Sequence, residues 1–289
     1  MRTLMVLIIS LMLTGFSQSA ELTIGLIPEQ NVFKQIKRYR PIGDYVEKKT
    51  GVKIKYTILP RYGNIIESFK MKKMDGAFWG SFTGAMAIKK LGVEPIVRPV
   101  NLDGLSTYRG YIFVHKNSMI DSVERMRHSV IAFVDKATTA GYIFPVAYFR
   151  EKGVRNIESY FKEYYFAGSH DAAIFAVLEK EAEVGCAKNT IFDMLARQDS
   201  RVRDDLVILV ESPEVPSNGL GLIKEVSSEV KMKLQKTFIE MDNDPEGREV
   251  LSTFGALRFI ETSEADYAPV FELARKAGID LRHYDYEND

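Results

Sequence analysis

The chain reads Val130-Ile131-Ala132-Phe133-Val134-Asp135-Lys136-Ala137-Thr138-Thr139-Ala140-Gly141 at one junction, and this stretch decides its fold class. The apolar run predicts a buried strand, and the helix that follows is predicted to extend to residue 149. Thr138 and Thr139 place two hydroxyls beside the free backbone N–H groups of the helix start. Because a helix N-terminus carries about half a positive charge, this junction favours an anion without a lysine. In the alternative interpretation, Thr138 or Thr139 only caps the helix.

The same alternation of strands and helices runs outward from this junction in both directions. We predict strands at 22–27, 52–59, 75–80, 111–114, 164–167, 206–210 and 220–223, and helices at 41–49, 65–72, 84–90, 172–180, 228–241 and 245–254. The stretch from Asp121 to Glu124 matches a helix capping box. Strands that alternate with helices predict an α/β fold with largely parallel sheets covered on both faces. Two clusters of such units and a helical tail indicate two α/β lobes.

The composition excludes several classes of protein. The 289 residues include 39 Lys and Arg against 39 Asp and Glu, with 46% hydrophobic and 11% aromatic residues. This profile is typical of a folded globular protein rather than a disordered one, and the balanced charge excludes a strongly basic surface for nucleic acid. Cys186 is the sole cysteine, so we expect no internal disulfide and a buried thiol. With four histidines, a structural zinc site is not expected.

Residues 1–20 have the pattern of a secretory signal peptide. Arg2 supplies a positive charge, residues 4–13 form an apolar run, and small or polar residues lead to a cleavage site near Ser19 or Ala20. The apolar run is too short for a comfortable membrane span, and no second such run follows it. We therefore expect a mature protein that begins near Glu21 and is exported, consistent with a bacterial periplasm.

A second strand-to-helix junction, Gly168-Ser169-His170-Asp171, carries a histidine that can donate to an oxyanion. The alternative is that His170 only packs or caps, and Asp171 is the expected helix cap. The chain has no Gly-x-Ser-x-Gly, His-Glu-x-x-His, P-loop or Gly-x-Gly-x-x-Gly motif. Tyr164 and Tyr165 do not form an iron-binding pair, because adjacent strand residues point to opposite faces. We therefore expect neither catalysis nor a metal or other cofactor.

In the first half of the chain, two aromatic residues lie next to predicted helix starts. Tyr62 precedes the helix at 65–72, and Trp79 lies in the segment 75–80, which is predicted as a strand and then a tight loop and is followed by Ser81. Both aromatic side chains combine an apolar ring with a polar group, so they are candidates for lining a cleft. In the alternative interpretation they are core residues.

Taken together, these segments resemble the PhnD-like family, the periplasmic phosphonate, phosphite and phosphate-binding proteins of ABC transporters. The similar motifs are Gly-Leu-Ile-Pro from Gly25, the loop at 134–141, Gly-Ser-His-Asp-Ala at 168–172, Asp-Pro-Glu-Gly at 244–247, Arg-Phe-Ile at 258–260, and Asp-Tyr at 266–267. Each motif is weak alone, but they occur in the family's order over essentially the whole mature chain.

The resemblance implies a type II periplasmic binding protein, in which two α/β lobes joined by a two-strand hinge close on a ligand. Lobe 1 would comprise 21–111 and 219–289, and lobe 2 would comprise 112–218. Such a protein is not an enzyme. It would deliver its ligand to a membrane ABC permease, and a monomer without nucleic-acid partners is expected. The alternative is a sensory input protein whose closed form engages a receptor or sensor kinase. We set aside a third reading, a secreted phosphoesterase, because no activated nucleophile is visible.

The resemblance also implies roles for individual residues. Thr138 and Thr139 match the family's anion-binding loop, in which Ala140 stands where a third hydroxyl is usual. His170 matches the anion-contacting histidine, and Tyr62 and Tyr108 match tyrosines that reach the same group.

Asn218 and two aromatic residues bear on which anion is bound. Asn218 stands where aminoalkylphosphonate binders have an acidic residue for the substrate ammonium. A neutral residue there favours phosphate, phosphite or a small alkylphosphonate, because a buried ammonium without a carboxylate is costly. Trp79 and Phe82 would narrow the cleft around such a ligand.

Overall fold

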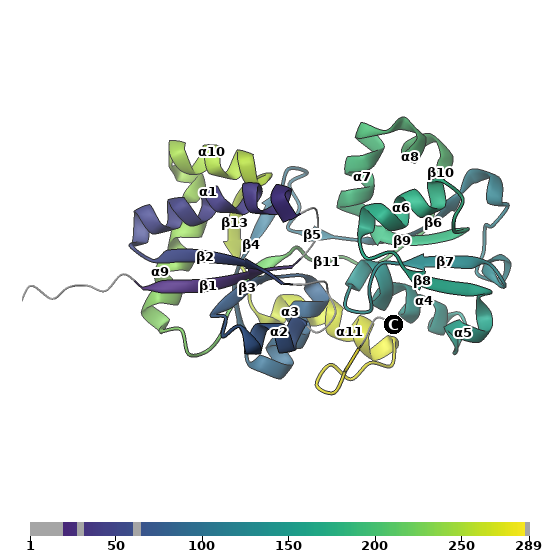
Figure 1. Ribbon diagram of the computed structural model, residues 1–289, viewed down its shortest axis with the longest axis horizontal. Coiled ribbons are helices and arrows are strands. Elements are labelled where there is room, and N and C mark those ends of the chain that lie inside the picture. Colours follow the sequence, from purple (N-terminus) through teal and green to yellow (C-terminus); the bar gives the residue numbers. More distant parts are fainter. Residues whose placement is uncertain (1–19, 28–31, 60–64, 287–289) are drawn as a thin grey trace, which may run out of the picture.

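The computed structural model describes residues 20–27, 32–59 and 65–286. It consists of two α/β lobes side by side, connected through the short strands β5 (Thr107–Tyr108) and β11 (Val215–Pro216) in the middle (Figure 1). These two strands pair antiparallel, with Tyr108 opposite Val215. The prediction of two α/β lobes joined by a two-strand hinge is therefore confirmed. The signal peptide predicted at 1–20 lies almost wholly outside the described residues.

The first lobe is built on a six-stranded sheet in the order β13-β4-β12-β3-β1-β2. The bounds of its strands are β1 Glu21–Leu26, β2 Lys53–Ile58, β3 Gly76–Trp79, β4 Glu94–Asn101, β12 Gly219–Leu222 and β13 Ala256–Glu261. Strand β1 pairs parallel with β2 and β3, whereas β12 is antiparallel to both β3 and β4. The chain thus returns from the second lobe into the middle of the first sheet.

The second lobe is built on a five-stranded sheet in the order β10-β6-β9-β7-β8. Its strands are β6 Gly110–His115, β7 Val130–Phe133, β8 Glu163–Phe166, β9 Val184–Lys188 and β10 Leu206–Glu211. Strand β7 is parallel to β8 and β9, while β6 is antiparallel to β9 and β10. The prediction of largely parallel sheets was therefore wrong. The first strand after each passage through the hinge, β6 in the second sheet and β12 in the first, runs against the direction of that sheet's parallel strands.

Helices cover both faces of each sheet (Figure 1). The α-helices are α1 Val32–Thr50, α2 Ile65–Met71, α3 Ser81–Leu91, α4 Phe144–Glu151, α5 Ile157–Tyr160, α6 His170–Leu178, α7 Asn189–Gln198, α8 Ser200–Asp205, α9 Ser228–Ile239, α10 Pro245–Phe254 and α11 Ala268–Lys276. Five short helical segments are η1 Lys116–Ser118, η2 Glu124–Met126, η3 Thr139–Ile143, η4 Met241–Asn243 and η5 Glu264–Tyr267. No helix in the described ranges is long and apolar enough to span a bilayer.

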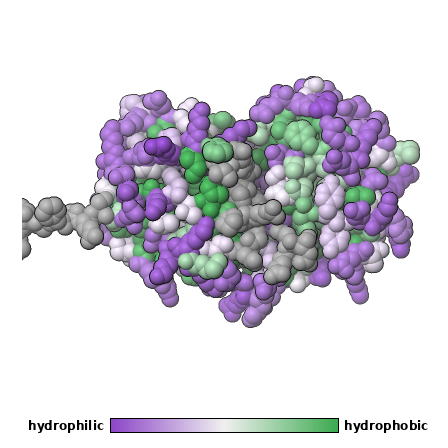
Figure 2. Space-filling model, in the orientation of Figure 1, coloured by the Kyte–Doolittle hydropathy of each residue, from purple (hydrophilic) through white to green (hydrophobic). Residues whose placement is uncertain are grey.

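The hydrophobic core has three parts. One cluster packs α1, α9 and α10 against the first sheet, and another packs α6, α7 and α8 against the second. The third runs from the α2–α3 side of the first sheet, through α11, to the α4 side of the second. Hydrophilic residues cover most of the visible outer face of both lobes, and hydrophobic residues are visible mainly toward the middle (Figure 2). Because the third part of the core runs through α11, this C-terminal helix packs on both lobes.

Several elements differ from the prediction. Helix α1 begins nine residues before Pro41 and carries this proline in its interior. The capping box expected at Asp121 to Glu124 is absent there, since η2 begins at Glu124 with Val123 at its N-cap and no side-chain cap. Strands β4, β9 and β13 and helices α7, α8 and α11 were not predicted. Of these, β9 and α7 bear directly on the candidate site.

Candidate functional site

A small buried cavity lies where the two lobes meet. Its volume is about 20 Å³, slightly more than the roughly 10–15 Å³ that a single water requires. The residues that line it come from both lobes and the hinge: Gly80, Ser81, Phe82, Thr83, Tyr108, Ala137, Thr138, Thr139, His170, Lys188 and Asn218. The two lobes and the hinge therefore bring their side chains together around one small space.

Four strand-to-helix turns converge on this cavity. They connect β3 to α3, β7 to η3, β8 to α6, and β9 to α7. Within the described residues, no side chain caps the helix starts at Gly80, Thr138 and Lys188. The first N–H groups of a helix have no partner inside the helix. These turns therefore direct backbone donors and the positive ends of helix dipoles toward one place, which favours an anion.

The loop between β7 and η3 supplies two hydroxyls, those of Thr138 and Thr139. Thr138 donates through Oγ1 to the carbonyl oxygen of Asp135 at 2.7 Å, so its hydroxyl braces the loop. The Thr139 side chain is only 3% exposed, and its Oγ1 has no hydrogen-bond partner. Neither hydroxyl caps the helix, so the capping alternative is not supported. Burying a polar atom without a hydrogen-bond partner costs free energy. The Thr139 hydroxyl can therefore donate to a ligand that offers an acceptor.

Gly141 explains why this loop folds so tightly. A Cβ at Gly141 would lie 2.4 Å from Val134 Cβ and 2.7 Å from Thr138 Oγ1. The amide of Val134 donates to the carbonyl of Gly141 at 3.1 Å, which fastens the end of the strand to the helix start. Ala140 is buried beside Gly110 and does not line the cavity. Only glycine at 141 lets the two threonines turn into the space between the lobes.

His170 opens α6 with its imidazole buried at 6% exposure. Its Nδ1 accepts from the backbone N–H of Lys188 at 3.2 Å. In the neutral ring the proton then sits on Nε2, which makes this atom a donor. Ser169 caps the helix, so the prediction of Asp171 as the cap was wrong, although Asp171 also accepts from the N–H of Ala172 at 3.0 Å. His170 therefore lines the cavity and does not serve as the cap of α6.

Ser81 and Tyr108 form the wall from the first lobe and the hinge. The Ser81 hydroxyl lies 2.6 Å from the carbonyl of Pro216 and 2.8 Å from the Tyr108 hydroxyl. Because that carbonyl can only accept, Ser81 donates to it and Tyr108 donates to Ser81. Ser81 is 1% exposed and Tyr108 is 6% exposed. This chain of hydroxyls ties α3 to the hinge strands beside the cavity.

Lys188 is a lining residue that sequence reasoning missed. It ends β9, stands at the N-cap of α7 and is 9% exposed. Its Nζ lies 4.3 Å from the centre of the Tyr108 ring and 3.5 Å from Oδ1 of Asn218. The signal was present in the sequence. The short apolar stretch before Lys188-Asn189-Thr190 follows the same strand-to-helix pattern as 130–141.

The other predicted residues divide between lining and core positions. Asn218 and Phe82 line the cavity, and Phe82 packs edge-on against Tyr284 with ring centres 5.5 Å apart. The prediction for Trp79 requires a correction, because its ring is 1% exposed and packs in the core on Phe69. The Trp79 indole N–H donates to the carbonyl of Gly221 at 3.2 Å. Tyr62 lies outside the described residues.

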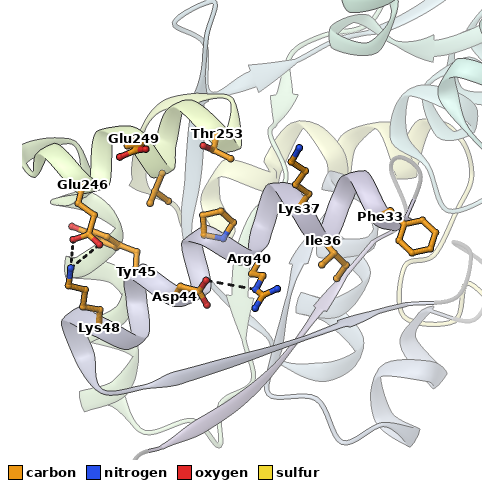
Figure 3. A pocket seen from close by; sticks show the side chains of 12 residues that line it. Phe33, Ile36, Lys37, Arg40, Asp44, Tyr45, Lys48, Glu246, Glu249 and Thr253 are labelled. Atoms are coloured by element: carbon orange, nitrogen blue, oxygen red, sulfur yellow. Dashed lines mark hydrogen bonds and ion pairs between the residues drawn. The ribbon is translucent and has the colours of Figure 1, made fainter.

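A much larger hollow lies between α1 and α10 on the first lobe. This groove has a volume of about 740 Å³, and Figure 3 shows the residues along it. Two ion pairs lie in it, Lys48 Nζ with Glu246 Oε2 at 2.7 Å and Arg40 Nε with Asp44 Oδ2 at 3.9 Å. Phe33 at its end is 84% exposed. Size alone therefore does not mark the binding site.

Two further features concern thiol reactivity and metal binding. The Cys186 thiol is fully buried, and burial raises its pKa well above the ordinary value, so it is unreactive at neutral pH. In the part of the chain that the structure describes, no three His, Cys, Asp or Glu side chains are grouped to hold a metal ion.

Comparison with known proteins places this architecture in a family. Residues 24–267 match the family model described as "ABC transporter, phosphonate, periplasmic substrate-binding protein". The "Phosphonates-binding periplasmic protein" of Escherichia coli is 26% identical over 89% of this chain and 77% of its own length. The "Probable ABC transporter phosphite binding protein PhnD1" of Prochlorococcus marinus is 22% identical over 90% of this chain and 91% of its own. These relatives are binding proteins, not enzymes.

Solved structures agree on the fold. A binding protein component of an ABC phosphonate transporter from Pseudomonas aeruginosa superposes with a TM-score of 0.79 at 23% identity, covering 90% of this chain and 87% of that one. The Prochlorococcus marinus protein in complex with methylphosphonate gives a TM-score of 0.77 at 20% identity, covering 90% and 99%. The fold is that of type II periplasmic binding proteins. This chain belongs to the family of periplasmic substrate-binding proteins of phosphonate ABC transporters.

Proposed function

We propose that this protein captures a small phosphorus oxyanion (phosphate, phosphite or a small alkylphosphonate) between its lobes and delivers it to a membrane ABC permease. The observation that carries the proposal is the Thr139 hydroxyl, which is buried and without a partner at the cavity. An oxyanion oxygen would accept its proton. The printed names of relatives, for phosphonates and phosphite, support the same ligand class.

The donors around the cavity suit a tetrahedral anion. The Thr139 hydroxyl and His170 Nε2 are side-chain donors from the second lobe, next to uncapped backbone N–H groups at the helix starts. Ser81 and Tyr108 approach from the first lobe and the hinge. We propose that Thr138, Thr139, His170, Tyr108, Ser81 and Asn218 contact the ligand, with Tyr62 as a further contact. Hydrogen bonds to a charged group contribute about 1.5–3 kcal/mol each.

The physical mechanism is a shift between open and closed forms. We propose lobe 1 as 21–111 with 219–289, and lobe 2 as 112–218, moving about β5 and β11. Because contacts from both lobes exist only when the lobes are closed, the ligand favours the closed form by its difference in affinity for the two forms. The closed form would then dock on the permease as a monomer, after the signal peptide is removed.

The proposal is tested by thermal unfolding of residues 21–289 with phosphate, phosphite, methylphosphonate, 2-aminoethylphosphonate and sulfate, after refolding to strip carried-over ligand. A ligand at about a hundred times its Kd should stabilise the protein by roughly 2.7 kcal/mol, a rise of a few degrees in Tm. We expect this rise with a phosphorus oxyanion and its loss in Thr138→Ala/Thr139→Ala. No rise with any phosphorus oxyanion would overturn the ligand assignment.

A further inference from the structure

We propose that Tyr284 is a positioning residue for the anion site, whose hydroxyl holds the loop of Thr138 and Thr139 against the first lobe when the two lobes are closed. The inference deepens the proposed function and rests on it, since it concerns how tightly the closed form keeps its ligand. Tyr284 lies in the C-terminal segment 277–286, which follows α11 and does not line the cavity.

The C-terminal part of the chain crosses between the lobes outside the hinge (Figure 1). Tyr267, at the N-cap of α11, packs so closely on α3 of the first lobe that a Cβ at Gly84 would lie 2.8 Å from its ring. At the other end of α11, Lys276 Nζ lies 2.6 Å from Glu151 Oε1 of α4, in the second lobe. This helix therefore begins on one lobe and ends on the other, and it connects them in addition to β5 and β11.

Tyr284 contacts both lobes at once. On the first lobe, its backbone carbonyl accepts from Lys90 Nζ at 2.7 Å, and its ring packs edge-on against Phe82 with ring centres 5.5 Å apart. On the second lobe, its hydroxyl donates to the carbonyl of Lys136 at 3.1 Å. Lys90 and Phe82 both belong to α3, whereas Lys136 belongs to the loop between β7 and η3. One residue therefore joins an element of each lobe.

The two elements that Tyr284 joins carry facing walls of the cavity. Phe82 lines the cavity from the first lobe, and Lys136 directly precedes residues 137–139, which line it from the second. Because Lys90 and Phe82 fix Tyr284 to α3, separation of the lobes moves the Lys136 carbonyl away from the Tyr284 hydroxyl. This hydrogen bond therefore belongs to the closed form, and it lies behind the anion-binding loop rather than in the ligand space.

The surroundings of Tyr284 keep its hydroxyl a donor and fix its direction. Burial raises the pKa of Tyr284, so the hydroxyl remains protonated at neutral pH. Its ring stacks on that of Tyr286, with ring centres 5.3 Å apart and planes 23° apart. A hydrogen bond that exists only in the closed form adds to the free energy of closing, and ligand affinity rises with the population of that form. Tyr284 thus acts on the ligand through the loop.

The test compares Tyr284→Phe with Tyr160→Phe as its matched control. Both wild-type hydroxyls donate to a backbone carbonyl, but that of Tyr160 bonds Val123 at 2.7 Å within the second lobe, so it does not bear on closing. Titration calorimetry measures the affinity of wild type and both variants for phosphate, phosphite and methylphosphonate, after refolding to strip carried-over ligand. Thermal unfolding without ligand checks the fold and the stability of each variant.

We expect Tyr284→Phe to weaken binding about 2- to 10-fold, by the same factor for every phosphorus oxyanion that wild type binds, because the hydroxyl acts on closing. Tyr160→Phe should lower the Tm and leave affinity unchanged. Unchanged affinity in folded Tyr284→Phe, losses that differ clearly among the ligands, or an equal loss in Tyr160→Phe would overturn the role of Tyr284. If wild type binds none of the three anions, the proposed function itself fails.

Discussion

The inter-lobe cavity and the groove between α1 and α10 differ in almost every respect. The cavity has a volume of about 20 Å³ and the groove about 740 Å³. In the cavity, the Thr139 hydroxyl is buried without a partner. In the groove, Lys48 and Glu246 form an ion pair in water, with exposed fractions of 64% and 44% (Figure 3). A surface pair of this kind contributes little.

The difference shows what defines a binding site in this fold. The groove is wide because two amphipathic helices lie side by side, and two ion pairs, Arg40 with Asp44 and Lys48 with Glu246, engage four of its charged side chains. The cavity is small because the lobes close over it, yet four strand-to-helix turns end there. Donors that secondary structure leaves unused, brought together where water is scarce, are a stronger indication of an anion site than open volume is.

The largest effect is expected where the cavity's unused donor is removed. Thr139→Val keeps the shape of the side chain and removes the hydroxyl. Because Thr139 Oγ1 has no partner in the ligand-free protein, we expect the Tm of the Thr139→Val variant to equal or exceed that of wild type. Affinity for the phosphorus oxyanion should fall about 10- to 100-fold. Calorimetric titration and thermal unfolding of the same sample measure both quantities.

Thr50→Val is the matched control for this prediction. Thr50 is 7% exposed, its Oγ1 donates to the carbonyl of Val46 at 2.6 Å, and it accepts from the N–H of Val52 at 2.9 Å. Loss of these bonds should cost about 1–2 kcal/mol of stability and leave affinity intact. A Thr139→Val protein that is destabilised but binds normally would reverse the roles assigned to the two threonines.

A smaller effect is expected at acid pH beside the groove. The ammonium of Lys49, 2.5 Å from Asp244 Oδ2, and the Tyr45 hydroxyl lower the pKa of Asp244. In the unfolded chain, where an Asp has a pKa of about 3.9, this carboxylate binds a proton at a higher pH than it does in the folded protein. The carboxylate therefore stabilises the fold above that pH, and the contribution disappears as pH falls through the folded pKa.

Asp244→Asn tests this dependence. At neutral pH its Tm should lie below that of wild type, and the difference should shrink as the pH is lowered through about 4. Asp242→Asn, in the segment before α10, serves as the control in the same calorimetric series. A difference that is constant with pH would show that charge is not the cause. Oxyanion affinity at neutral pH should be the same in all three proteins.

The smallest effect is expected at the exposed end of the groove. Phe33 is 84% exposed, so Phe33→Ser should change stability by no more than about 0.5 kcal/mol. Its oxyanion affinity should match that of wild type within about twofold, since Phe33 is not among the residues that line the cavity. A large loss of affinity in this variant would mean that the groove, and not the cavity, takes the ligand.

Prediction from sequence succeeded where local pattern and burial agree. The strand at 130–134 followed by paired threonines, and the Gly-Ser-His-Asp turn, both stand at helix starts as expected. It failed at β9 because Gly185, Cys186 and Ala187 are small and resemble a loop. Gly185 is required there, since a Cβ would lie 2.6 Å from the Phe113 ring. That close packing is a tertiary constraint, and Lys188 was missed with the strand.

Two other errors have similar causes. Strand β4 contains Pro95 and Pro99, which normally argue against a strand inside a sheet, yet β12 and β13 pair on either side of it with irregular registers. Pro41 suggested a helix start, but α1 continues through it because Tyr39 and Ile42 are both buried against the sheet. In each case packing of the whole lobe outweighed local preference.

By itself, the sequence determined the α/β class, the two-lobe organisation and the junctions that carry Thr138, Thr139 and His170, because these follow from periodicity and helix-start chemistry within short segments. The tertiary structure decided that Trp79 is a core residue, because all four residues of β3 are buried and sequence does not say which side faces the cavity. It also decided that Lys188 meets Tyr108 and Asn218. Contacts between residues 30 to 80 positions apart depend on how the lobes close, and no local pattern records that.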